Sequence, residues 1–161
     1  AIMMMDLFGV DQGAGNFALT AYLAAMAGGV LLGGVAADRI GNHNFLVSAT
    51  IAGGALFLAL IAPGWGGYFF GLGAIAVSGF LMGIASPSRD LIVRGASPPE
   101  SIGLAFGYTS TGLSIGFAAG PPAVGWLRDL GRPDLGLLAL AGISMCAVLT
   151  VFGMRAGSAR R

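Results

Sequence analysis

The sequence has no lysine, a single cysteine and a single histidine, and only 9% of its residues are charged. Because Cys146 has no second cysteine to pair with, an intrachain disulfide is excluded. His43 alone supports neither a histidine metal cluster nor a serine–histidine nucleophile. A net charge of +1 argues against a basic surface for nucleic acid. We therefore expect no catalytic residue, no metal, no cofactor and no nucleic-acid partner.

Charges are confined to the two termini and to the gaps between long uncharged stretches. The mean hydropathy is +0.85, and 56% of the residues are hydrophobic, which is too apolar for the surface of a soluble domain of this size. About 20 apolar residues cross the roughly 30 Å hydrocarbon core of a bilayer as a helix. The sequence therefore predicts an all-α, polytopic transmembrane bundle in one domain, with five spans at about 14–37, 44–62, 65–86, 102–127 and 135–154.

The arginines predict the orientation of this bundle, because cytoplasmic loops are enriched in Lys and Arg. With five spans the two termini lie on opposite sides of the membrane. Arg128 and Arg132 fall on one side, and six arginines fall on the other: Arg39, Arg89, Arg94, Arg155, Arg160 and Arg161. We expect the chain to lie in a bacterial inner membrane, with its N-terminus outside and its C-terminus in the cytoplasm.

The connection after the first span carries a recognisable motif. The stretch 34–43 reads G-V-A-A-D-R-I-G-N-H and resembles the G-x-x-x-D-R-x-G-R-R loop of the major facilitator superfamily. Asn42 and His43 replace the usual basic pair. Four positions match the motif, namely Gly34, Asp38, Arg39 and Gly41.

A second connection, 87–101, resembles the segment between the tenth and eleventh helices of the same family. We expect Pro87 to end the third span, because proline cannot donate a helical hydrogen bond. Residues 91–93 then suit a short interfacial helix, and Ser97 or Ser101 a helix cap. Asp38 is the expected gate residue: its carboxylate would accept amide hydrogens from a helix N-terminus, or pair with Arg89 or Arg94, when the cytoplasmic side closes.

Glycines at four-residue spacing predict close helix packing. Span one has Gly29 and Gly33, and span three has Gly79 and Gly83. Span four has a glycine stripe followed by two prolines that we expect to kink the helix, and this run is similar to the eleventh helix of the family: Gly112, Gly116, Gly120, Pro121 and Pro122.

The resemblance implies that the five spans are helices eight to twelve of a transporter whose N-terminal half is missing here. Spans one, three and four would then contribute to a substrate cavity, through Asn16, Tyr22, Phe69, Phe70, Ser78, Tyr108 and Ser110. No Asp, Glu or Arg lies within the spans, so a coupling charge would lie in the missing part.

The resemblance implies a secondary active transporter that moves a small organic solute by alternating access. A passive channel or a structural membrane subunit is the alternative, because a charge-free, glycine-rich bundle is compatible with it. An embedded enzyme finds no support in the residues present.

Overall fold

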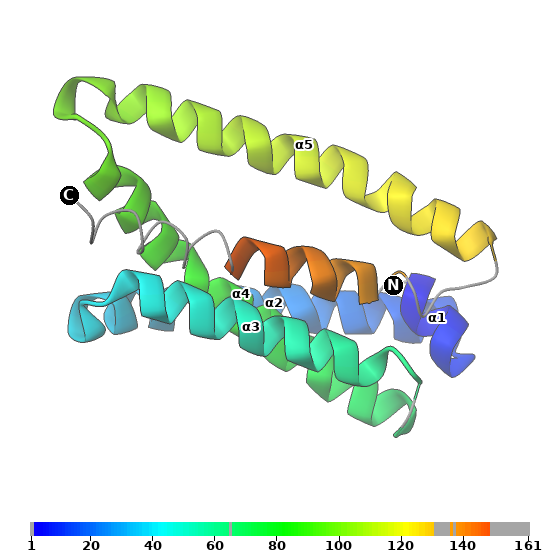
Figure 1. Cartoon of the computed structure of the whole chain (residues 1–161). Coiled ribbons are helices and arrows are strands. Elements are labelled where there is room, and N and C mark those ends of the chain that lie inside the picture. The colour runs from blue at the N-terminus through cyan, green and yellow to red at the C-terminus, as the bar shows by residue number, and fades with distance from the viewer. Residues whose placement is uncertain (1, 65, 131–135, 137, 149–161) are drawn as a thin grey trace.

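The computed structural model describes residues 2–64, 66–130, 136 and 138–148. Within these ranges the chain is helical and has no strand (Figure 1). The predicted all-α transmembrane bundle is confirmed. The elements are α1 (Ile2–Phe8), α2 (Gln12–Ile40), α3 (His43–Ile61), α4 (Gly67–Ala96), the 3-10 turn η1 (Pro99–Ser101), α5 (Ile102–Asp129), and an unlabelled apolar helix, Leu138–Val148.

Four of these helices are long and apolar enough to cross a membrane: α2, α3, α4, and η1 together with α5. They correspond to the first four predicted spans. Of the fifth, the structure describes residue 136 and the helix Leu138–Val148, and the remainder of 135–154 lies outside the described residues. A chain with several such helices is a multi-pass membrane protein.

Pro87 does not end the third span, contrary to the prediction from sequence. Helix α4 continues for nine further residues to Ala96, so the segment 91–93 forms the last turns of α4 rather than a separate interfacial helix. Proline removes the N–H that would bond the Gly83 carbonyl, but a membrane helix tolerates this where its neighbours hold it. Ser88, the next residue, is fully buried. Tertiary packing therefore keeps the backbone helical through the proline.

The two serines expected to cap the following helix have other roles. The Ser97 hydroxyl donates to the Val93 carbonyl at 2.7 Å, which places Ser97 at the C-terminal end of α4. The Ser101 hydroxyl donates to the Pro98 carbonyl at 3.3 Å, within the turn η1. Helix α5 follows η1 directly, so neither serine caps it from a preceding loop.

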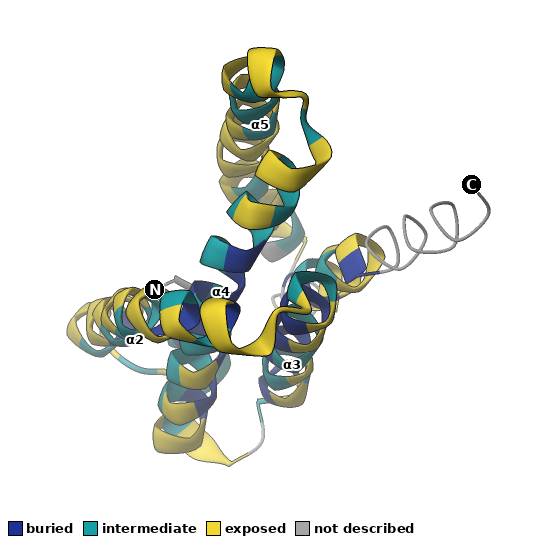
Figure 2. Cartoon of the chain, turned by 90° about the vertical axis from the view of Figure 1, so that its left-hand side faces the viewer, coloured by how far each residue is buried: buried dark blue, intermediate teal, exposed yellow. Residues whose placement is uncertain are grey.

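Helix α4 lies between α2 and α3 (Figure 2). It contacts both along much of their length, whereas α2 and α3 touch each other little. The α2–α3 and α4–α5 connections lie at one end of the bundle, at the left of Figure 1. We call this end the motif end. The α3–α4 connection lies at the other end.

The glycines predicted for close packing join α2 to α4. A Cβ atom on Gly33 would lie 2.7 Å from the Ile84 Cα atom, and one on Gly79 would lie 2.6 Å from the Tyr22 carbonyl oxygen. Gly29 and Gly83 meet backbone atoms of the other helix more closely still. The contacts advance in the same direction along both helices, so α2 and α4 run parallel. The predicted stripes on these two spans are confirmed.

Helix α5 packs differently from the other spans. It contacts α4 near its own start and then separates from the layer of α2, α4 and α3 (Figure 2). Its apolar side chains are largely exposed. No described atom lies within 4 Å of a Cβ built on Gly112, Gly116 or Gly120, so the packing predicted for this stripe stays a prediction. Both prolines, Pro121 and Pro122, lie inside α5, which continues unbroken to Asp129.

Candidate functional site

The connection that carries the family motif is a two-residue turn between α2 and α3. Gly41 ends α2 in the left-handed conformation with φ of 65°, and its N–H donates to the Ala37 carbonyl at 3.3 Å. Glycine adopts this φ without steric cost. Asn42 then caps α3: its side-chain oxygen accepts the Phe45 N–H at 3.3 Å. The asparagine that replaces a basic residue of the family motif therefore has a structural role here.

Asp38 and Arg39 occupy the last turn of α2, and both side chains are exposed. The negative end of the helix dipole favours Arg39 and disfavours a carboxylate at this position. In the described part of the chain, Asp38 has no ion pair and no side-chain hydrogen bond. Its charge is thus available to a partner.

Asp38 faces a pocket between three helices at the motif end. The pocket has a volume of about 340 Å³. It is lined from α2 by Gly34, Ala37 and Asp38, and from α5 by Phe106. The lining residues of α4 are Pro87, Asp90, Leu91 and Arg94. The structure therefore brings together three of the predicted gate residues, Gly34, Asp38 and Arg94. The pocket also holds Asp90, which sequence reasoning had not placed in the gate.

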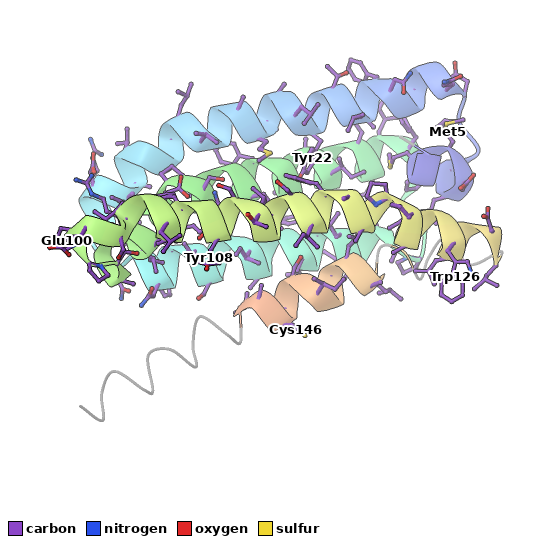
Figure 3. The ribbon with its side chains drawn as sticks, turned by 90° about the horizontal axis from the view of Figure 1, so that it is seen from above. Met5, Tyr22, Glu100, Tyr108, Trp126 and Cys146 are labelled. Atoms are coloured by element: carbon purple, nitrogen blue, oxygen red, sulfur yellow. The ribbon has the colours of Figure 1, made fainter. Side chains whose placement is uncertain are left out.

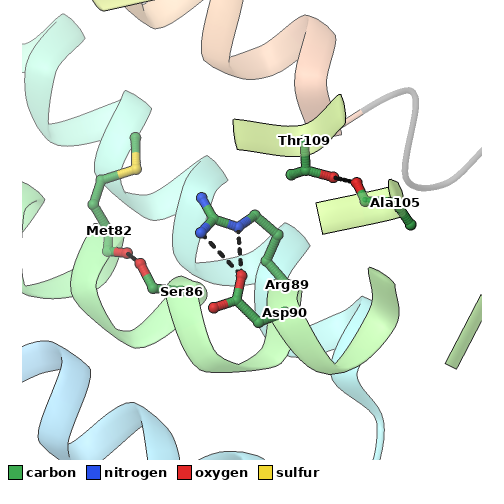
Figure 4. A network of polar contacts seen from close by, with 6 residues as sticks. All are labelled: Met82, Ser86, Arg89, Asp90, Ala105 and Thr109. Carbon is green, nitrogen blue, oxygen red and sulfur yellow. Dashed lines mark hydrogen bonds and ion pairs between the residues drawn. The ribbon is translucent and has the colours of Figure 1, made fainter. Parts of the chain in front are cut away.

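Arg89 is not among the residues that line this pocket. Its Nε and Nη2 atoms both donate to Asp90 Oδ1, at 3.1 and 3.0 Å (Figure 4). Both side chains are partly exposed, at 41% for Arg89 and 49% for Asp90. Of the two partners expected for Asp38, only Arg94 therefore shares its pocket.

A second, larger pocket lies beside the first, on the α3 side of α4. Its volume is about 510 Å³, and the turn and α3 contribute one wall while the end of α4 contributes the other: Gly41, Asn42, His43 and Asn44 face Leu91, Ile92 and Gly95. The His43 Nδ1 atom is buried without a hydrogen-bond partner. Sequence reasoning missed this pocket, because it depends on α4 extending past Pro87.

The residues predicted to form a substrate cavity lie in different surroundings. Ser78 is buried and donates to the Gly54 carbonyl of α3 at 3.2 Å, so it belongs to the α3–α4 contact. Tyr22 packs its ring against Gly79 of α4. The others, Asn16, Phe69, Phe70, Tyr108 and Ser110, are exposed. Figure 3 shows Tyr22 on α2 and Tyr108 on α5. Neither pocket described above includes any of the seven.

Asp90 could have been found from the sequence. It lies four residues before Arg94, a spacing that places two side chains on one face of a helix. That signal applies only if the helix is continuous through 87–96, and we had expected it to end at Pro87.

The family model described as Major Facilitator Superfamily matches residues 1–160. The match includes both connections at the motif end and every described helix. No match was found among curated proteins or among solved structures.

Proposed function

The chain belongs to the major facilitator superfamily, and on this basis we propose that it is part of a secondary active transporter that moves a small organic solute by alternating access. Membership implies a transport function rather than an enzymatic one. What we propose beyond transport itself is secondary active transport by alternating access, with a small organic molecule as the solute.

The shared pocket of Asp38 and Arg94 is the observation that carries the proposal. The two side chains come from different helices and are not paired in the structure, among the residues described. A small approach of the α2 end toward the α4 end would bring the carboxylate and the guanidinium together in a charge-assisted contact. Such a contact, made in one state and lost in the other, shifts a two-state equilibrium. We assign Asp38 and Arg94 this gating role.

Arg39 and Gly41 support the same gate indirectly. Gly41 sets the turn that ends α2 directly after Asp38, and Arg39 anchors that helix end through the dipole. Arg89 acts through Asp90 rather than through Asp38.

In the proposed orientation the motif end faces the cytoplasm. Three of the six arginines assigned to that side, Arg39, Arg89 and Arg94, lie at the motif end, and Arg128 lies in the last turn of α5 at the opposite end. The enrichment of arginine at the motif end supports a cytoplasmic location. The remaining three, Arg155, Arg160 and Arg161, lie outside the described residues, as does Arg132.

We propose that α2 to α5 and the helix Leu138–Val148 correspond to helices eight to twelve, and that a further N-terminal half completes the transporter. The exposed face of α5 supports this, because its glycine stripe has no neighbour within the described chain. The exposed residues Asn16, Phe69, Phe70, Tyr108 and Ser110 then contribute to a cavity between the halves. Because no Asp, Glu or Arg lies in the hydrocarbon region of this chain, the coupling charge belongs to the other half.

The test is gradient-driven solute transport by the complete transporter in vesicles. Asp38→Asn removes the charge at nearly constant size, and we expect it to reduce transport at least about fivefold, the low end of typical coupling between sites. Asp129→Asn, an exposed carboxylate at the opposite end of α5, is the matched control and should retain transport. Unchanged transport in Asp38→Asn would reject the gate, and unsaturable downhill flux would indicate a channel.

A further inference from the structure

Arg94 shares its pocket with two carboxylates, those of Asp38 and Asp90. Asp38 lines this pocket from α2, and Asp90 lines it from α4, four residues before Arg94. Acid followed by base at this spacing is the favourable order for an ion pair on a helix surface. A pair within α4 would remain intact whether the pocket is open or closed. Asp90 is therefore a competitor of Asp38 for the same guanidinium.

Arg89 prevents this competition in the structure. It holds Asp90 Oδ1 through two hydrogen bonds at 3.1 and 3.0 Å, and it does not line the pocket itself. Among the residues that line the pocket, Asp90 is the only one in an ion pair. Arg89 bonds to Asp90 from the neighbouring position, and Arg94 is unpaired in the pocket that it shares with Asp38.

We propose that Arg89 and Asp90 form a positioning pair that reserves Arg94 for Asp38. The pair sets how readily the gate closes, without itself forming the gate contact. This inference rests on the proposed function, because it requires that Asp38 and Arg94 pair in the closed state.

If Arg89 and Asp90 act in this way, a second substitution should restore the function that a first one reduces. Arg89→Gln releases Asp90, which then captures Arg94 on its own helix, so the variant weakens the same contact as Asp38→Asn, to a smaller extent. Removing the competitor as well, in Arg89→Gln/Asp90→Asn, leaves Arg94 available again and restores the gate. A second substitution that repairs the first is not expected if Arg89 only supports folding.

The experiment measures both transport and gate geometry in the complete transporter. Replacing Cys146 by serine removes the only cysteine of this chain, and cysteines at Ile40 and Gly95, both exposed near the ends of α2 and α4, then carry spin labels. Pulsed electron resonance gives the fraction of molecules with a short distance between the two labels. The unfolding midpoint of each variant shows whether it folds.

We expect Arg89→Gln to lower transport and the short-distance fraction about twofold, the scale of the exposed Asp90–Arg94 pair that it releases. We expect the double variant to return both to the level of the parent. If Asp38→Asn lowers transport but Arg89→Gln does not, or if the double variant stays as low as the single one, the positioning role is overturned while the gate stands. If Asp38→Asn itself has no effect, the gate and this inference both fail.

Discussion

Gly83 of α4 lies so close to Gly29 of α2 that a Cβ atom built on Gly83 would come within 2.9 Å of the Gly29 Cα atom. Both glycines are buried, and the backbones of the two helices are in contact at this point. Any larger residue forces the helices apart, and α2 and α4 together carry all the polar residues of the gate pocket.

We therefore expect Gly83→Ala to lower the free energy of unfolding by about 1–3 kcal/mol, the usual cost of overpacking a dense contact. Gly73→Ala on the same helix is the matched control, because no atom lies within 4 Å of a Cβ there. The control should be neutral or slightly stabilising, since alanine is the better helix former. Denaturation in detergent measures the free energy of unfolding of both variants. Equal values for Gly83→Ala and Gly73→Ala would contradict the close packing of α2 on α4.

Ser78 is expected to act in packing rather than in substrate binding. Ser78→Ala removes its 3.2 Å hydrogen bond to Gly54 and should cost about 0.6 kcal/mol, the average for such bonds between membrane helices. The substrate KM should not change. Ser110→Ala, an exposed serine on α5, is the control for stability. A raised KM with unchanged stability in Ser78→Ala would instead place this hydroxyl in the cavity.

Gly41→Ala should destabilise the turn between α2 and α3. Its φ of 65° costs a residue with a Cβ atom about 1–2 kcal/mol. Gly28→Ala, within α2 and with open space around its Cβ position, should show no such loss. The thermal unfolding midpoints of the two variants decide the matter, and a Gly41→Ala midpoint equal to that of the parent would refute the strain argument.

Pro87→Ala should stabilise α4. Alanine restores an N–H that can donate to the Gly83 carbonyl, a net gain of about 1 kcal/mol. Pro99→Ala is a suitable control, because Pro99 begins the turn η1, where the missing N–H has no helical acceptor. The prediction fails if the midpoint of Pro87→Ala does not exceed that of the parent.

The fold class and the packing of α2 on α4 could be predicted from sequence because each depends on a local, repeated pattern. Uncharged runs mark spans, and glycines four residues apart permit close approach. The family motif likewise identified the end of α2 that carries Asp38.

The remaining features depend on tertiary contacts that a local pattern does not encode. Pro87 is a helix breaker in isolation, yet α4 continues through it to Ala96 and packs against both α2 and α3. Placing the helix end there hid the relation between Asp90 and Arg94. Arg89 was one of the two partners expected for Asp38, whereas in the fold it bonds to its sequence neighbour Asp90.

The unbroken α4 also determines where the gate lies relative to lipid. Its 30 residues, at about 1.5 Å each, give a rod of about 45 Å, against a hydrocarbon core of about 30 Å. With the start of α4 at one membrane surface, residues 89–94 extend past the other surface into the headgroup layer and the water beyond it. Ions screen charges there over about 8 Å at physiological strength. Rising salt should therefore weaken the proposed contact between Asp38 and Arg94 and favour opening of the pocket at the motif end.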